Sequence, residues 1–209
     1  MSSQKERVAS SLEKYMPKEF IPYVVELMFS ERISFRISKP RKTKSGDYRP
    51  PFQGEPHRIS INGDLNPYAF LITTIHEFAH MTTHIKYGAG IKSHGVEWKN
   101  EFKRLLLPVL EKKTLPKEIE QALLRSLNNL KASSCTDLHL SRALKKHNKE
   151  DKPMVLLEDL NNNAYFRLNK KNFQRGVLRR TRYLCKEINT GKSYLVSRLA
   201  EVEPLENSI

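Results

Sequence analysis

Two histidines and a glutamate occur at the spacing that zinc hydrolases use. The run from His76 to His80 reads H-E-F-A-H, which fits the pattern H-E-x-x-H. On a helix this spacing places both imidazoles on one face, in consecutive turns, where they can bind one Zn²⁺. Glu77, beside them, can take a proton from a water that the metal activates. The pattern therefore predicts a catalytic zinc site, which needs a third protein ligand and one open position.

His94 is the best candidate for the third ligand. It stands between Ser93 and Gly95, after a break formed by Gly88 and Gly90. We expect Ser93 to cap a second helix, which would place His94 in the first turn of that helix. Gly95 has no Cβ, so the backbone can pass close to the metal at that point.

Three other residues are alternatives for the third ligand. With His84 as the ligand, three imidazoles would span ~12 Å of one helix axis, too far to converge on one ion. We therefore interpret His84 as a surface residue or a neighbour of the ligands. Glu97 or Glu101 would give the His₂Glu set of thermolysin-type peptidases. A histidine-glycine pair after a long spacer favours His94 over both.

The elements that must position these residues are two helices. Asn66 is a good N-cap and Pro67 suits the first helical position, so a helix should begin there and continue to the glycine break at Gly88. Apolar neighbours of the motif predict that this helix is largely buried; they are Tyr68, Phe70, Leu71, Ile72, Ile75, Phe78 and Ala79. The second helix is predicted to run on through Trp98, Phe102, Leu105 and Leu106, at spacings of three and four.

Upstream, the chain predicts two helices followed by two strands. The helices cover residues 3–17, opened by an S-x-x-E capping box, and residues 18–30. Residues 32–38 alternate strictly, so Ile33, Phe35 and Ile37 share one face of a strand, and residues 57–62 form the second strand. The basic segment 39–56 between them reads as a loop that could hold a nucleic-acid strand or shape a substrate groove; a solvated hairpin tip is the alternative.

The region from about Ile59 to Leu106 resembles the SprT-like family of zinc metallopeptidases, which includes the Spartan proteases. The family pattern is H-E-x-x-H, a spacer with glycine, then H-G and an aromatic residue, here Trp98. The resemblance implies that His76, His80 and His94 bind zinc and that Glu77 is the catalytic acid/base. It also implies a protein substrate that is bound or crosslinked to DNA, single-stranded or duplex. Tyr48 and Tyr87 are candidates for stabilising an oxyanion.

The expected fold class is α+β: a mainly helical zincin-like metallopeptidase domain with a small β-sheet, over residues 1–131, and a small β-rich unit over residues 132–209. Many SprT-like proteins carry a zinc ribbon with two cysteine pairs in the second region. This chain has only Cys135 and Cys185, neither in a C-x-x-C pair, so the ribbon is expected to be degenerate. A helix starting at Pro116 should precede the boundary.

The basic charge is concentrated in the C-terminal third. The chain carries a formal charge of +14, and residues 131–200 hold 16 Lys and Arg against 6 Asp and Glu. This excess favours a nucleic-acid partner, with a solubilising surface as the alternative. Strands are expected at 153–158, 164–168, 177–185 and 193–199. The candidate nucleic-acid contacts are Arg175, Arg179, Arg180, Arg182 and Lys192, whereas the neighbouring aromatic residues are expected to be core.

Composition narrows the class of protein further. No run approaches the ~20 apolar residues of a membrane helix, and the N-terminus lacks the apolar region of a secretory signal. Two unpaired cysteines fit a reducing compartment. We therefore expect a cytoplasmic protein with no membrane partner. The alternative to a peptidase is a non-catalytic nucleic-acid-binding or transcription- or stress-associated protein with a structural zinc; Glu77 argues against it, because a structural site has no need of that carboxylate.

Overall fold

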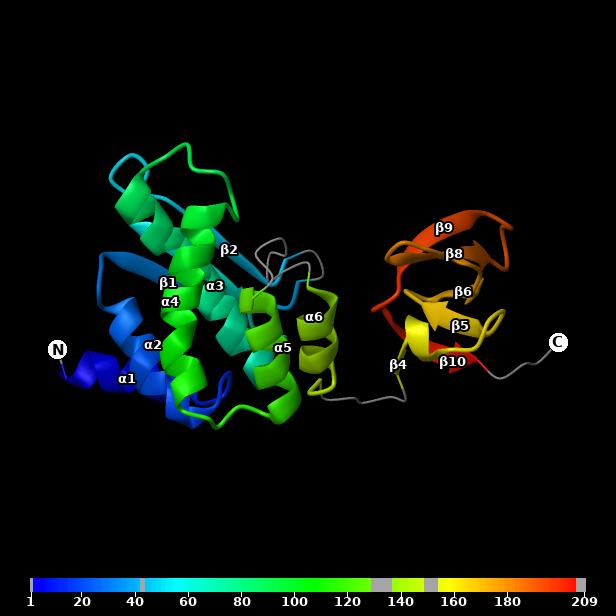
Figure 1. Cartoon of the computed structure of the whole chain (residues 1–209), viewed down its shortest axis with the longest axis horizontal. Helices are drawn as coiled ribbons and strands as arrows, with labels where there is room; N and C mark the ends of the chain where they lie inside the picture. The colour runs from blue at the N-terminus through cyan, green and yellow to red at the C-terminus, as the bar shows by residue number, and fades with distance from the viewer. Residues whose placement is uncertain (1, 42–43, 129–136, 149–153, 206–209) are drawn as a thin grey trace. The chain divides into compact units, whose positions relative to one another are not determined.

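The chain folds into two compact units, residues 1–148 and 149–209. The computed structural model describes residues 2–41, 44–128, 137–148 and 154–205. The fold class is α+β, as predicted: the α-helices lie in the first unit, together with a three-stranded sheet, and the second unit is β-rich (Figure 1). No helix in the described residues is both long and apolar enough to cross a membrane.

The first unit surrounds one hydrophobic core. Its helical elements are α1 (Ser2–Leu12), η1 (Lys18–Phe20), α2 (Ile21–Met28), α3 (Pro67–Tyr87), α4 (Val96–Glu111), α5 (Lys117–Asn128) and α6 (Leu138–Lys145). Helix α3 is the central element, with Phe70, Ile75 and Phe78 fully buried. Its predicted caps are confirmed: the Asn66 side chain accepts a hydrogen bond from the Ala69 backbone amide at 2.9 Å, and Gly88 ends the helix.

The sheet of the first unit has the order β1-β3-β2, with β1 (Ile33–Ser38) parallel and β2 (Gly46–Arg49) antiparallel to β3 (His57–Asn62). The alternation predicted for β1 is confirmed, because Ile33, Phe35 and Ile37 pack against the core. The segment 39–56 is not all loop, because β2 lies within it. Four strand residues with a glycine at one end are too short a pattern to separate from loop sequence.

The boundary between the units differs from the expected one after residue 131. Helix α6, which the sequence reading left out, belongs to the first unit, and its Leu140 and Ala143 are part of the first core. Asp137 caps this helix by accepting hydrogen bonds from the backbone amides of His139 and Leu140. The unit boundary therefore follows Asn148. Cys135 lies outside the described residues.

The second unit is built on a seven-stranded sheet with the order β4-β10-β5-β6-β8-β7, and β9 paired to β8. The strands are β4 (Val155–Leu156), β5 (Tyr165–Leu168), β6 (Lys171–Gln174), β7 (Leu178–Arg179), β8 (Arg182–Glu187), β9 (Ser193–Ser197) and β10 (Glu201–Leu205). A short 3₁₀ helix, η2 (Leu157–Asp159), follows β4. The core of this unit contains Phe166, Phe173 and Tyr183, as expected. Tyr194, which was also expected in the core, is exposed and meets the edge of the Phe173 ring.

The strands expected in this unit match the structure only in part. Within the described residues of the strand expected over 153–158, only the two residues of β4 are extended in the sheet, and η2 follows them. Strand β6 was not predicted; it starts directly after Asn169 and Lys170, which have positive φ. The single strand expected over 177–185 is a hairpin of β7 and β8 that turns at Arg180, also at positive φ. Strand β10 was not predicted. Lysine and arginine seldom adopt positive φ, so these tight turns had no clear signature in the sequence.

Candidate metal centre

Three imidazole nitrogens from two parts of the first unit converge on one point. The Nε2 atoms of His76, His80 and His94 lie 3.1–3.2 Å from one another. Ligands of a tetrahedral zinc with bonds of 2.0–2.1 Å are separated by about 3.3 Å. Three nitrogens in such a tight triangle cannot all be joined by straight hydrogen bonds, whereas a cation above the triangle satisfies all three lone pairs. These histidines can therefore hold a metal ion.

The protonation of the triad suits a metal. Burial lowers the pKa of His76 to about 3 and that of His80 to about 4, and repulsion between the neighbouring imidazoles acts in the same direction. Burial also lowers the pKa of His94. All three rings are thus neutral near pH 7, which is the form that binds a metal.

His94 reaches the site from a tight turn and not from a helix. Ser93 is not a helix cap; Gly95 is the N-cap of α4, and His94 precedes it with φ of 58°. The Gly95 amide donates to the carbonyl of Lys92 at 2.8 Å, and a Cβ on Gly95 would stand only 2.8 Å from that same oxygen. Gly95 therefore serves the turn that aims His94, which differs from its expected role beside the metal.

The Trp98 indole packs against the imidazole rings of all three histidines. Its ring centroid lies 4.7 Å from that of His76, 5.3 Å from that of His80 and 4.6 Å from that of His94. The indole is buried and stacks on Phe102 at 5.0 Å. The sequence placed Trp98 in the second helix without a role at the site. Its position four residues after His94 on an apolar helix face was the available signal.

Glu77 lies beside the triad under strand β2. Its side chain is buried, and a Cβ on Gly46 would stand 2.3 Å from the Glu77 Oε1 atom. The backbone amide of Tyr48 donates a hydrogen bond to the Glu77 carboxylate. Strand β2 can cover the carboxylate this closely only because position 46 has no side chain.

The pKa of Glu77 is raised to about 7. Burial is the largest cause, and the Asp47 carboxylate adds to it. The cations of Arg41 and Lys44 and the amide of Tyr48 act in the opposite direction. A carboxyl group with this pKa can both accept and return a proton near neutral pH.

A cleft of about 660 Å³ opens over the triad. Strand β2 forms one wall through Gly46, Asp47 and Tyr48, and α6 contributes Leu140 and Leu144 to the lining. The last turn of α6 is tied to the start of α3, because Asn66 Nδ2 donates to the Leu144 carbonyl at 2.8 Å. Helix α6 was not predicted as part of the site; the Asp137 cap and the leucines after it were the available signal.

The remaining candidates lie apart from the triad. Glu101 is buried but binds Lys86 at 2.6 Å and Arg104 at 2.9 Å, so it holds α3 to α4. His84 packs near Tyr48, whose hydroxyl lies 3.0 Å from His57 Nδ1. Within the described part of the chain, the metal-ligating group consists of the three histidines alone. Tyr87 is exposed and does not line the cleft.

The predicted nucleic-acid contacts of the second unit divide into two kinds. Arg179, Arg180, Arg182 and Lys192 are exposed. Arg175 is a correction: its side chain is buried, and its guanidinium donates to the Leu160 carbonyl and the Tyr183 hydroxyl. Arg175 is part of the interior of this unit and not of its surface.

Comparison with family models, with curated proteins and with solved structures gives no match for this chain.

Proposed function

We propose that the first unit is a zincin-like, zinc-dependent metalloendopeptidase of SprT-like type, which acts on proteins bound or crosslinked to DNA. The observation that carries this proposal is the triangle of three neutral imidazoles with the buried Glu77 carboxyl beside it, at the base of an open cleft. A closed structural zinc site normally has four protein ligands. Three histidines in a cleft leave room for water and substrate.

The roles of the residues follow from their chemistry. His76, His80 and His94 would hold the metal, and Glu77 would take a proton from the attacking water and later deliver it to the leaving amine. When bound, zinc supplies a Lewis acid that acidifies water and polarises a peptide carbonyl. Trp98 keeps the imidazoles in one orientation, and the Tyr48 amide keeps the Glu77 carboxylate in place.

Strand β2 offers a way to bind an extended peptide. It lies at the edge of the sheet, paired on one side with β3. An edge strand can add a further strand through backbone hydrogen bonds, with side chains seated in alternate pockets. A peptide added to β2 would lie across the cleft beside Glu77. This arrangement supports an endopeptidase, because pairing with the edge strand binds the main chain within a peptide and does not require a chain terminus.

The DNA-bound substrate class is supported by the charge of the chain. The formal net charge is +14, and positively charged side chains are exposed in both units. Such a surface binds phosphate backbones and brings the enzyme to the proteins on them.

The test compares wild type with Glu77→Gln on a DNA-bound protein substrate, with and without single-stranded DNA, alongside the zinc content of each purified protein. We expect one zinc in both proteins and a loss of 10²–10⁴-fold in cleavage for Glu77→Gln, the range of general acid–base catalysis. Glu111→Gln, an exposed carboxylate on α4, is the matched control and should cut normally. If both proteins hold zinc and bind DNA but neither cuts, the metal is a structural clamp and the chain a binding module.

A further inference from the structure

The outer face of the three-stranded sheet, opposite the core, gathers four arginines. Alternation in β1 places Arg36 on the opposite side of the strand from Phe35 and Ile37. Arg36, Arg41, Arg49 and Arg58 line a shallow cleft of about 430 Å³ on this side, and we call this set the arginine face. The alternation of β1 predicted the apolar face of the strand, and Arg36 lies on its other face.

The strand register brings like charges together. Arg49 of β2 lies directly opposite Arg58 of β3, and Arg36 lies on β1, at the far side of β3. Like charges in directly opposed positions of a sheet destabilise it. Such an arrangement is expected where an anion bound between the side chains offsets their repulsion.

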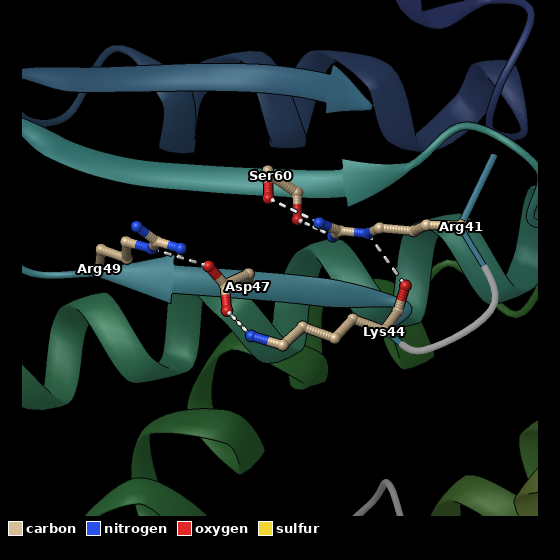
Figure 2. A network of polar contacts seen from close by, with 5 residues as sticks. All are labelled: Arg41, Lys44, Asp47, Arg49 and Ser60. Atoms are coloured by element: carbon tan, nitrogen blue, oxygen red, sulfur yellow. Dashed lines mark hydrogen bonds and ion pairs between the residues drawn. The ribbon is translucent and has the colours of Figure 1, made fainter. Parts of the chain in front are cut away.

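The countercharge on this face is already engaged. Among the described residues that line the cleft, Asp47 is the single carboxylate, and it pairs with Lys44 at 2.7 Å and with Arg49 at 3.0 Å (Figure 2). Arg41 is anchored by uncharged acceptors: its Nη2 donates to the Ser60 carbonyl and its Nε to the Lys44 carbonyl (Figure 2). The face therefore keeps a strong positive excess.

Two buried donors in the cleft lack a partner. Arg58 Nε and Ser38 Oγ are inaccessible to solvent and make no hydrogen bond to any described residue. Leaving a buried polar group unsatisfied costs about 1–3 kcal/mol. Phosphate oxygens accept several hydrogen bonds at once and suit the planar fork of arginine. The arginines that line the cleft therefore suit a ligand with clustered acceptor oxygens.

We propose that the arginine face binds the phosphate backbone of a nucleic-acid strand. Arg36 and Arg49 project from strands two places apart, a separation of about 10 Å in a sheet. One inorganic phosphate is too small to reach both, whereas consecutive phosphates of a strand can. The described residues that line this cleft include no aromatic side chain on which a base could stack, so we expect contacts to the phosphate backbone and not to the bases.

Strand β2 separates this site from the metal cleft by one backbone. Asp47 lines both clefts, while its neighbours Gly46 and Tyr48 contact Glu77 on the other side. Nucleic acid held here would keep an attached protein next to the metal cleft. That use rests on the proposed peptidase function; the binding itself does not.

The experiment measures binding of a fluorescein-labelled single-stranded oligonucleotide to the full chain by anisotropy, over a series of salt concentrations. The variant Arg36→Gln/Arg49→Gln removes two cations of the face. We expect affinity at moderate salt to fall about tenfold and the slope of log K against log salt to decrease by about 1.4, or 0.7 for each phosphate contact with a single strand. The matched control, Lys103→Gln/Arg125→Gln, removes two exposed cations from α4 and α5 and should keep the wild-type slope.

Several outcomes would overturn the proposal. An equal loss in the control variant would show that only net charge matters. A loss confined to Arg179→Gln/Arg180→Gln would move the site to the second unit. Competition by inorganic phosphate as strong as by the oligonucleotide would indicate a small-anion site, and equally tight binding of polyglutamate would indicate an acidic-peptide site. Repeating the titration with Glu77→Gln separates binding from proteolysis, because retained binding without cleavage supports the face whatever happens to the proposed function.

Discussion

The two faces of the three-stranded sheet in the first unit differ in the chemistry of their side chains. The inner face presents Phe35 and Ile37 to the core and, at β2, the side-chain-free Gly46 to Glu77. The outer face presents Arg36 and Arg49, with Asp47 as the single carboxylate among its described lining residues. The period of two in a strand lets neighbouring residues serve both surfaces, so a change at one position need not disturb the other. The comparison predicts that inner-face changes alter the metal centre and catalysis, whereas outer-face changes alter binding.

The largest effect is expected at the metal triad. His94→Ala removes one of three ligands, so zinc affinity should fall by more than 100-fold, beyond what loss of a ligand's hydrogen-bond partner costs, and cleavage should disappear. Zinc titration against a chromogenic chelator measures the affinity. His84→Ala is the matched control, because His84 is outside the triad. A normal zinc affinity in His94→Ala would remove His94 from the site.

The next effect concerns the buried carboxyl of Glu77 in the metal-free protein. Its folded pKa of about 7 exceeds the ordinary 4.5, so the folded state binds more protons than the unfolded state between these values. This term stabilises the fold below pH 4.5 and is lost as pH rises through 7. Glutamine does not ionise, so the Glu77→Gln variant keeps its stability as the pH rises. Its free energy of unfolding relative to wild type should therefore rise by about 3 kcal/mol from pH 4.5 to above 7.

Urea unfolding in the presence of a chelator, at several pH values, measures this difference. The lowered pKa values of His76 and His80 act with the opposite sign in both proteins: stability is present above the ordinary pKa of 6.5 and falls as pH drops toward 3–4. Subtracting the two curves cancels the histidines. A difference that does not change with pH would mean that folding does not raise the pKa of Glu77.

Gly46→Ala should disturb the inner face without touching a ligand. The new Cβ would stand 2.3 Å from Glu77 Oε1 and 2.7 Å from Thr73 Cγ2, so the carboxylate or the strand must move. Misplacing a catalytic group by about 1 Å can cost 10²-fold in rate, and we expect a loss of this order with unchanged zinc content. Peptidase assays on Gly46→Ala and on the neighbouring control Ser45→Ala test this. Normal activity in Gly46→Ala would mean that β2 does not hold Glu77.

The smallest effect distinguishes a buried arginine from an exposed one in the second unit. Arg175→Met leaves the Leu160 carbonyl and the Tyr183 hydroxyl without their donor, so this unit should lose about 1–3 kcal/mol of stability while DNA binding persists. Arg179→Gln should change stability by less than about 0.5 kcal/mol. Thermal unfolding and oligonucleotide binding of both variants provide the measurement. If a stably folded Arg175→Met variant bound DNA more weakly, Arg175 would belong with the exposed residues that contact nucleic acid.

Local patterns predicted much of the first unit correctly. The capped helix from Pro67 to Tyr87, the strand with Ile33, Phe35 and Ile37 on one face, and the helix after Pro116 are all present. Each depends on residues within a few positions of one another, so propensity and spacing carry the information. Strand β2 and helix α6 were missed, because they are short and obtain most of their stability from packing on the core.

For the site, the sequence determined the donor set: H-E-x-x-H on a helix, followed by a histidine-glycine pair. The tertiary structure alone decided three other features. It placed His94 in a left-handed turn at the triad, it laid β2 and α6 along the cleft, and it buried Arg175 while leaving Arg36 exposed. The physical reason is that a periodic pattern fixes which side of an element a residue occupies, whereas the packing of distant elements decides what lies on that side.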